Sequence, residues 1–321
     1  MLRSTGIIAM LLLIALLSGC GGGGSSSSDK AVVDNSRYTV SELLDKTTPA
    51  KWTILVYMDG DNDLESYVLS NINQMENIGS SPNIKIVCQV DRIKSYSNED
   101  GDWTDTRRYL ITKDSNSSKM GSYRMDSDEP LGELNMADPQ VLKNFIDWGV
   151  ENFPAEHYCI ILWNHGSGWE FASSSRSAVS AQAIISDDTS GNSMNIVDIP
   201  DAISAVKSDI LAFDACFMQE IEVAYELKDS ANYMVGSTTS ESSYGFNYQK
   251  FISRISGTST TIEVGKALVD AYSDEYSNYD SCTLSFIDLS QMDNLALACD
   301  TLADTLYKNR TEWATYINSS Y

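Results

Sequence analysis

Several runs of consecutive apolar residues recur along the chain, and each gives way to a polar loop and then to residues with helical spacing. The clearest runs occupy residues 52–58, 84–90, 158–163, 210–213 and 233–237. Strands that are buried on both faces read as continuous apolar runs, and strands that alternate with helices form parallel sheets. The sequence therefore predicts an α/β fold, in which a mostly parallel central sheet is flanked by helices on both faces.

The segments between these runs supply the helices and a few shorter strands. Asp138 and Pro139 predict one helix start, with Asp as the N-cap and Pro at the first helical position. Helical spacing predicts helices at residues 64–78, 139–152, 196–207, 217–227, 248–255, 262–279 and from about 291. Shorter strands are expected at residues 107–112, 181–185 and 282–287.

The first residues have the order of a secretory signal. Arg3 precedes an apolar run at residues 7–17, which ends in Leu17-Ser18-Gly19-Cys20. The run is too short to span a membrane as a helix. Its ending resembles a bacterial lipobox, which implies cleavage before Cys20 and lipidation of that residue. A plain signal that is cleaved near Gly19 is the alternative.

The segment after the signal indicates a tether. Residues 21–28 are Gly and Ser only, so residues 20–50 are expected to be flexible. The expected organisation is a lipoprotein signal peptide at residues 1–19, this lipidated tether, and one large domain at residues 51–321. The protein is therefore expected at the cell envelope as an exported bacterial lipoprotein anchored to a membrane. The lack of a charged residue at Gly21 favours the outer membrane, if the cell has one.

The net charge and the cysteine content argue against several classes of partner and site. The formal net charge of −23 argues against nucleic acid or anionic lipid as a partner and would attract basic substrates. Exported proteins are also acidic for solubility, which is a second explanation of the same charge. The chain has six cysteines, so with Cys20 lipidated an odd number remains and at least one thiol is free. No Cys-x-x-Cys spacing occurs, which argues against a structural zinc site.

One cysteine follows the apolar run at residues 210–213, in the sequence Asp214-Ala215-Cys216. Helical spacing resumes directly after it, so Cys216 is expected on a strand-to-helix turn at the carboxyl edge of the sheet, where α/β proteins place their chemistry. The N-terminus of that helix would lower the pKa of the thiol and favour the nucleophilic thiolate. The alternative is a buried thiol that packs as a small hydrophobe.

The chain contains two histidines, and one of them is expected at the same edge. His157 lies at the amino end of the strand at residues 158–163, whereas His165 follows its carboxyl end. A nucleophilic cysteine needs a base or an imidazolium partner, which His165 supplies for Cys216. Gly166 has no side chain, which lets a backbone N–H approach a ligand closely. A purely structural histidine is the alternative.

Two motifs, Asn164-His165-Gly166-Ser167-Gly168 and Asp214-Ala215-Cys216, resemble those of the clostripain-like cysteine peptidases, within the larger group of caspase, legumain and gingipain folds. Weaker similarity extends the resemblance to about residues 51–255. It implies a caspase-like three-layer sandwich in which Cys216 is the nucleophile and His165 protonates the leaving amine. It also implies an oxyanion hole formed by the backbone N–H groups of Gly166 and Cys216.

The resemblance further implies a pocket for a basic side chain. Asp214 matches the acid that lines the S1 pocket and selects Arg or Lys, and strand alternation places it on the same face as Cys216. A carboxylate that caps the following helix is the alternative. Relatives tend to carry further acids in the loop after the next strand, and there Glu241 is the candidate in this chain.

An acidic loop with Asp59, Asp61 and Asp63 follows the apolar run at residues 52–58. The spacing resembles the start of an EF-hand loop, but Leu64 and Ser70 stand where that loop needs Gly and Glu, which excludes an EF-hand. The loop is either an ordering element of the sheet edge or a calcium site, as in some relatives. No other cofactor is expected.

Some relatives are activated by self-cleavage between the histidine and the cysteine. Arg176 is the basic residue of the Ser-rich loop at residues 170–180 and is the candidate processing site, with an ordinary exposed arginine as the alternative. The sequence as a whole predicts a lipid-anchored cysteine endopeptidase that cleaves proteins or peptides after Arg or Lys. The alternatives are a non-catalytic surface lipoprotein that uses the fold as a binding module, and a cysteine hydrolase or transpeptidase with another substrate.

Overall fold

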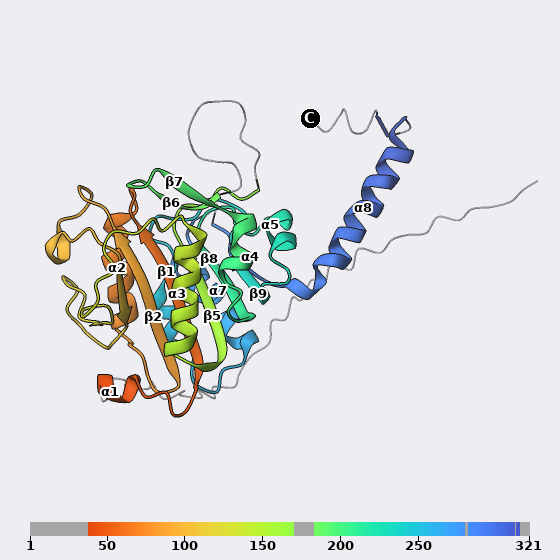
Figure 1. The fold of residues 1–321 in the computed structure, drawn as a ribbon. Helices are drawn as coiled ribbons and strands as arrows, with labels where there is room; N and C mark the ends of the chain where they lie inside the picture. The colour runs from red at the N-terminus through yellow and green to blue at the C-terminus, as the bar shows by residue number, and fades with distance from the viewer. Residues whose placement is uncertain (1–37, 170–182, 280–281, 312, 315–321) are drawn as a thin grey trace, which may run out of the picture. The chain divides into compact units, whose positions relative to one another are not determined.

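The computed structural model describes residues 38–169, 183–279, 282–311 and 313–314 (Figure 1). Its centre is an eight-stranded sheet in the order β10-β9-β8-β5-β1-β2-β3-β4. Neighbouring strands are parallel from β9 to β2, and β10, β3 and β4 extend the two edges in antiparallel pairing. The strands of this sheet are β1 (Ala50–Gly60), β2 (Ile84–Arg92), β3 (Arg107–Leu110), β4 (Tyr123–Arg124), β5 (Ala155–Trp163), β8 (Ser208–Asp214), β9 (Ala231–Gly236) and β10 (Ser285–Asp288).

Helices cover both faces of the sheet, as the sequence predicts. Alternate residues of β1 enter two separate cores: Leu55 and Tyr57 pack with α3, α4 and α5, whereas Ile54 and Val56 pack with α2, α6 and α7. Figure 1 shows α3 and α4 in front of the sheet. The helices of the two layers are α3 (Pro139–Asn152), α4 (Ile199–Ala202) and α5 (Ile221–Glu226) on one face, and α2 (Glu65–Glu76), α6 (Tyr248–Ser253) and α7 (Thr261–Tyr276) on the other.

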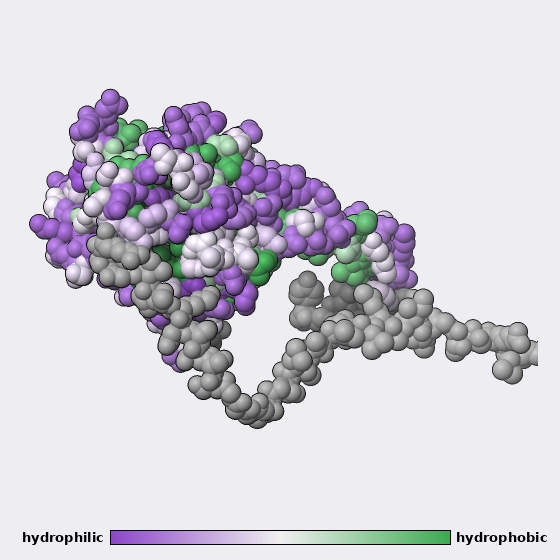
Figure 2. Space-filling model, turned by 90° about the horizontal axis from the view of Figure 1, so that it is seen from below, coloured by the Kyte–Doolittle hydropathy of each residue, from purple (hydrophilic) through white to green (hydrophobic). Residues whose placement is uncertain are grey.

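The remaining elements are short or peripheral. A hairpin of β6 (Ala183–Asp187) and β7 (Asn192–Asn195) forms a second, two-stranded sheet. The other elements are α1 (Val40–Leu43), η2 (Glu99–Gly101), η3 (Ile196–Asp198), η4 (Leu289–Gln291) and α8 (Met292–Lys308). Among the residues described, no helix has the length and apolarity that crossing a membrane requires. The face seen in Figure 2 is mainly hydrophilic, with small separate hydrophobic areas.

The structure confirms the mostly parallel α/β sandwich and corrects two predicted helices. Asp138 accepts a hydrogen bond from the Gln140 N–H and caps α3, with Pro139 in its first turn, as predicted. The helix predicted at residues 196–207 is wrong: η3 and α4 replace it and end at Ala202. Pro200 has no N–H to donate to a preceding turn, so one helix cannot run through this segment.

The helix predicted at residues 217–227 is also wrong at its start. It begins only at Ile221, because Phe217 has a left-handed conformation with φ of 62°. The Phe217 N–H bonds to the Thr239 carbonyl instead of a helical partner. The turn after β8 is therefore held by a loop that lies far away in sequence.

A buried ion pair joins α2 to β2. The Arg92 guanidinium lies 2.5 Å from Glu65 Oε1, and both side chains are almost fully buried. Arg92 also donates to the Glu99 carbonyl at 3.2 Å and lies over the ring of Trp103. Removing one partner of such a pair leaves an uncompensated buried charge, which costs about 3–5 kcal/mol.

We expect Glu65→Leu to lower the free energy of unfolding by about 3–5 kcal/mol, because it leaves the Arg92 charge buried and unpaired. The double variant Glu65→Leu/Arg92→Met should recover much of that loss, since apolar residues can replace a buried pair. Urea unfolding measures both. As a control, Lys143→Met in the exposed pair with Asp147 should change stability by less than about 1 kcal/mol. A double variant less stable than the single one would contradict this account.

Candidate active site

Two loops leave the sheet side by side at its carboxyl edge. Trp163, the last residue of β5, is the register partner of Asp214, the last residue of β8. The segments that follow carry His165 and Cys216, and both residues line one cavity of about 120 Å³. The cavity is bounded by residues from three loops: Leu64, Trp163, Asn164, His165, Asp214, Ala215, Cys216, Glu241, Ser242, Ser243 and Gly245.

Cys216 is half-buried at this cavity, and its sulfur is engaged by a neighbouring loop. The Glu241 N–H donates to Cys216 Sγ at 3.1 Å. The prediction that a helix N-terminus acts on this thiol is wrong, because α5 starts only at Ile221 and the helix dipole falls off within about one turn. The alternative of a fully buried thiol does not apply either, unlike at Cys88 and Cys159.

His165 is half-exposed at the other side of the cavity. Its Nε2 lies 2.6 Å from Asp63 Oδ1, and the described residues show no hydrogen bond between His165 and Cys216. Catalytic hydrogen bonds are often long in free enzymes and tighten only when substrate binds. Spacing along the sequence does not predict Asp63 as the partner of His165, since the two residues are 102 positions apart.

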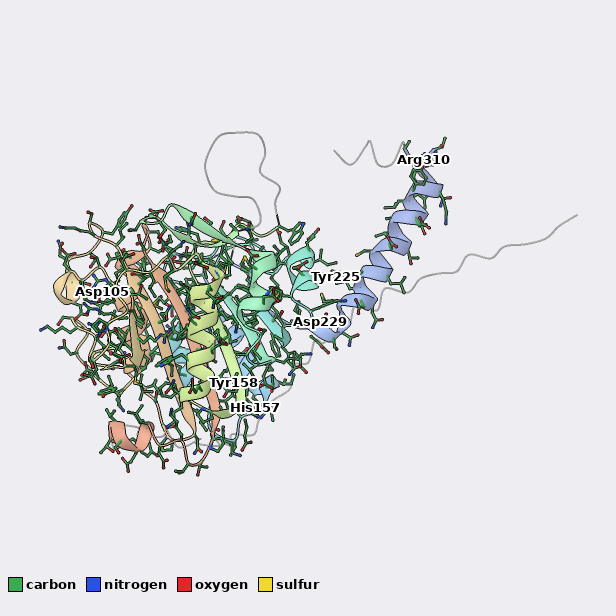
Figure 3. The ribbon with its side chains drawn as sticks, in the orientation of Figure 1. Asp105, His157, Tyr158, Tyr225, Asp229 and Arg310 are labelled. Carbon is green, nitrogen blue, oxygen red and sulfur yellow. The ribbon has the colours of Figure 1, made fainter. Side chains whose placement is uncertain are left out.

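His157 lies at the opposite end of β5, as predicted. Figure 3 shows it at the lower end of the strand, away from the β6–β7 hairpin. Its Nδ1 lies 3.0 Å from Asp209 Oδ1, and its ring stacks on Trp52. These contacts give His157 a structural role at the amino edge of the sheet.

Gly166 allows the two loops to approach. A Cβ added at this position would lie only 2.4 Å from the Cys216 carbonyl oxygen, a backbone atom that cannot move aside easily. The glycine is therefore required by the contact between the loops. Its closeness to Cys216 brings the two residues predicted to form the oxyanion hole next to each other.

Two residues beside the site have strained backbones. Phe217 directly follows Cys216, and Ile185 has φ of 61°, a conformation that is costly for a β-branched residue. The Ile185 N–H donates to the His165 carbonyl at 3.2 Å. Each of these backbone conformations costs of order 1–3 kcal/mol and persists only where surrounding contacts hold it. Such strain is common in loops that position functional residues.

Two acidic residues, Asp214 and Glu241, are among those that line the cavity. Asp214 is buried, and burial raises its pKa to about 7, although the Phe246 N–H and the Tyr248 hydroxyl donate to it. Burial, followed by the charge of Asp214, raises the pKa of Glu241 well above its usual range. Both Glu241 carboxylate oxygens are buried and lack a partner within the described part of the chain. Asp214 does not cap α5, because that helix has no side-chain cap.

The three aspartates of the loop after β1 contact different partners. Asp63 pairs with His165, and Asp59 accepts from the Asn164 amide at 2.9 Å, which holds the residue before His165. Asp61 instead lies close to Asp91 and Asp187, two acids that sequence spacing did not connect with it. Burial raises the pKa of Asp91 to about 8.

Cys20 and Arg176, the predicted lipidation and processing residues, lie outside the described residues.

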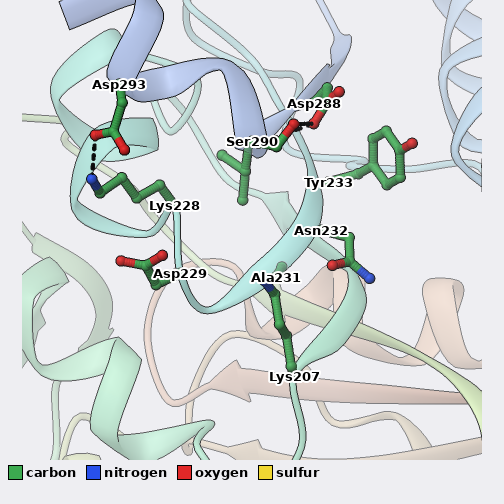
Figure 4. Close-up of a pocket in the computed structure, with 10 residues that line it drawn as sticks. Lys207, Lys228, Asp229, Ala231, Asn232, Tyr233, Asp288, Ser290 and Asp293 are labelled. Carbon is green, nitrogen blue, oxygen red and sulfur yellow. Dashed lines mark hydrogen bonds and ion pairs between the residues drawn. The ribbon is translucent and has the colours of Figure 1, made fainter.

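A larger cavity of about 510 Å³ lies elsewhere, at the ends of β8 and β9 opposite to Cys216 (Figure 4). It is lined by Lys207, Lys228, Asp229 and other polar side chains, and it contains no cysteine or histidine. The Lys228–Asp293 ion pair crosses its rim. The smaller cavity is lined by both Cys216 and His165 and is therefore the candidate active site.

Comparison with known proteins agrees with this geometry. The model of the Clostripain family matches residues 56–321. Clostripain of Hathewaya histolytica is 31% identical over 85% of this chain, and the chain spans 60% of that relative's length. In structure, the chain resembles an inactive zymogen of a C11 protease from Parabacteroides distasonis, with a TM-score of 0.61, 27% identity, and coverage of 79% of this chain and 66% of that one.

A second solved structure of a C11 protease also resembles this chain. A secreted C11 cysteine protease from Bacteroides thetaiotaomicron, in complex with an irreversible peptide inhibitor, has a TM-score of 0.60 and 25% identity, with coverage of 78% of this chain and 69% of that one. Because the family model covers most of the chain and the cysteine and histidine motifs meet at one sheet edge, this protein belongs to the clostripain family.

Proposed function

We propose that this protein is a cysteine endopeptidase in which Cys216 and His165 carry the reaction. The observation that carries the proposal is the cavity at the carboxyl edge, which both side chains line together with the carboxylate of Asp214. A family relative that forms a complex with an irreversible peptide inhibitor supports the same chemistry. Peptides and proteins are the proposed substrates.

The reaction follows from the positions of the two loops. Cys216 Sγ attacks the scissile carbonyl carbon, and its thiol proton passes to His165, which donates it to the leaving amine. The negative charge on the former carbonyl oxygen is stabilised by the backbone N–H groups of Gly166 and Cys216. Water then attacks the thioester, releases the acid product and returns the proton to the thiol. Asp63 is a positioning residue, because its carboxylate holds the His165 ring.

We expect Cys216→Ala and His165→Ala to reduce peptide hydrolysis to background, because each removes a group that forms or breaks a bond. Asp63→Asn should lower kcat/KM only about fivefold, since an exposed ion pair contributes up to about 1 kcal/mol. Release of a fluorophore from peptides with Arg, Lys and neutral P1 residues measures these effects. The exposed Asp270→Asn variant is the matched control and should match wild type.

The same assay separates the alternatives. Equal background release by wild type and Cys216→Ala, on every peptide, would contradict the peptidase proposal and favour a binding module. Product joined to an added amine, in place of free acid, would identify a transpeptidase.

The proposed substrate preference is Arg or Lys at P1. Glu241 presents two buried carboxylate oxygens without a described partner, and Asp214 adds a second buried acid to the same cavity. Burying a negative charge is costly unless a positive group pairs with it. A guanidinium or ammonium group of the substrate would supply that positive charge, so binding and specificity would arise from the same contact.

This preference should depend on pH. Burial raises the pKa of Asp214 to about 7, so Asp214 holds a proton below that pH and is charged above it. The ratio of kcat/KM for Arg over citrulline at P1 should therefore rise as the pH increases from about 6 to 8. Citrulline has nearly the shape of arginine without its charge, and the ratio cancels every pH effect that the two substrates share.

In the same comparison, Asp214→Asn should lower kcat/KM for Arg by about 100-fold and leave citrulline almost unchanged, because a buried charge pair is worth about 3 kcal/mol. Tyr248→Phe removes a hydrogen bond to Asp214 but keeps its charge, and it serves as the control for loop distortion. An Arg-to-citrulline ratio that stays flat with pH and in Asp214→Asn would contradict this pocket.

We further propose that the protein is anchored to a membrane through lipid on Cys20. The order of a charge, an apolar run and Leu17-Ser18-Gly19-Cys20 supports the proposal, and a related protease is described as secreted. In cells grown with labelled palmitate, wild type should carry label and sediment with membranes, and Cys20→Ser should do neither. A wild-type protein found unlabelled in the medium would indicate a plain signal peptide.

A further inference from the structure

Two tyrosine rings meet at the rim of the candidate active site. Tyr67 lies in the first turn of α2, and Tyr244 lies in the loop between β9 and α6. Their ring centroids are 5.2 Å apart at an interplanar angle of 79°, which is an edge-to-face contact. Tyr244 stands between Ser243 and Gly245, and both of these neighbours line the cavity of the candidate active site. We call Tyr67 and Tyr244 the tyrosine pair.

The backbone of Tyr244 is fixed, although Tyr244 itself is 64% exposed. The side-chain amide of Asn71, a buried residue of α2, donates to the Tyr244 carbonyl at 3.1 Å. At the next residue, the Tyr276 hydroxyl donates to the Gly245 carbonyl at 2.7 Å. An aromatic side chain on a fixed backbone can bind a ligand with little loss of conformational entropy. The exposed ring is therefore suited to a binding contact.

Leu64 continues this apolar surface into the cavity. It directly precedes α2 and lines the cavity, and both Leu64 and Tyr67 pack against the core that α2 shares with α6 and α7. Single exposed apolar residues are common on protein surfaces, whereas apolar side chains that gather beside a cavity mark contact with a ligand. The rim on the α2 side of the cavity therefore favours an apolar group.

We propose that the tyrosine pair and Leu64 hold an apolar or aromatic side chain of the substrate on the amino-terminal side of the P1 residue. An aromatic side chain would gain both from the apolar surface that it covers and from edge contact with the tyrosine rings. This inference rests on the proposed peptidase function, and it adds a second determinant of specificity to the pocket for the basic P1 residue.

The position of His165 sets the direction in which the substrate lies. The leaving amine must lie next to His165, which protonates it. His165 and Gly166 contact β6, whose residues Ile184 and Ile185 pack in the core on the α3 face of the sheet. Tyr67 packs instead on the α2 face. A substrate with its amine toward β6 therefore directs the residues before P1 toward the tyrosine pair. Residues of an extended chain advance by about 3.3 Å each, so P2 and P3 are the residues concerned.

Hydrolysis of fluorogenic peptides with Arg at P1 and different residues at P2 and P3 tests this subsite. In the wild type, Phe in place of Gly at P2 or P3 should raise kcat/KM by about tenfold, which is the order that partial burial of an aromatic side chain gives. Tyr244→Ala and Tyr67→Ala should bring this ratio of Phe to Gly down to about twofold or less, because each removes a ring. Tyr244→Phe keeps the ring and should keep the ratio.

Tyr225→Ala is the matched control, because Tyr225 is an exposed tyrosine of α5 on the other face of the sheet. It should keep the wild-type ratio. A distorted active site would lower kcat/KM for the Phe and Gly peptides equally. Tyrosine-pair variants that lose activity in this way, and so keep the wild-type ratio, would contradict the proposal.

Binding to the Cys216→Ala variant gives a second readout that needs no catalysis. A fluorescein-labelled peptide with Phe at P2 and P3 and Arg at P1 should bind about tenfold more tightly than the peptide with Gly at P2 and P3. Adding Tyr244→Ala should remove the difference, as measured by fluorescence anisotropy. This measurement decides the inference even where the wild type cleaves no peptide, so a failure of the peptidase proposal is recognised separately. Equal affinity for the two peptides, or a preference for Phe only after the scissile bond in longer peptides, would overturn the inference.

Discussion

The pairing of β5 with β8 is the constraint on which the candidate site depends. Because Trp163 and Asp214 are partners in this parallel pair, the loops that carry His165 and Cys216 start from neighbouring points. Both strands are buried on two faces, and a slip of one residue would turn every side chain to the opposite face. The two hydrophobic cores therefore fix the relative position of the reactive groups, and the loops only complete it.

Acidic side chains form two groups at this edge of the sheet, and both groups lack a basic partner among the described residues. Asp214 and Glu241 line the cavity, and Asp61, Asp91 and Asp187 lie close to one another where β1, β2 and β6 end. Within the described residues, neither group is paired with a lysine or arginine side chain. A buried carboxylate is costly while it is charged and unpaired, so it either holds a proton or pairs with a cation. Under our proposed function, a basic side chain of the substrate supplies the cation for Asp214 and Glu241.

Local patterns in the sequence predicted the strands, the Asp138 cap and the shared edge of Cys216 and His165, because apolar runs and capping residues act over a few positions. The helix at Cys216 could not be excluded in this way, since the left-handed Phe217 depends on a bond to Thr239. The sequence did not predict that Asp61, Asp91 and Asp187 lie together, for a related reason. Asp61 and Asp187 come together only through the folded sheet, and spacing along the chain carries no signal of it.

The hydrogen bond from Glu241 to Cys216 has a consequence for attempts to re-engineer the protein. Under our proposed function, the segment that carries the Glu241 carboxylate of the substrate pocket is the same segment whose backbone N–H bonds to the sulfur of the nucleophile. On that proposal, substrate specificity and thiol reactivity depend on the same loop. A loop grafted from a relative to change the preferred side chain would also shift the nucleophile, so directed evolution of selectivity must select for turnover in the same step.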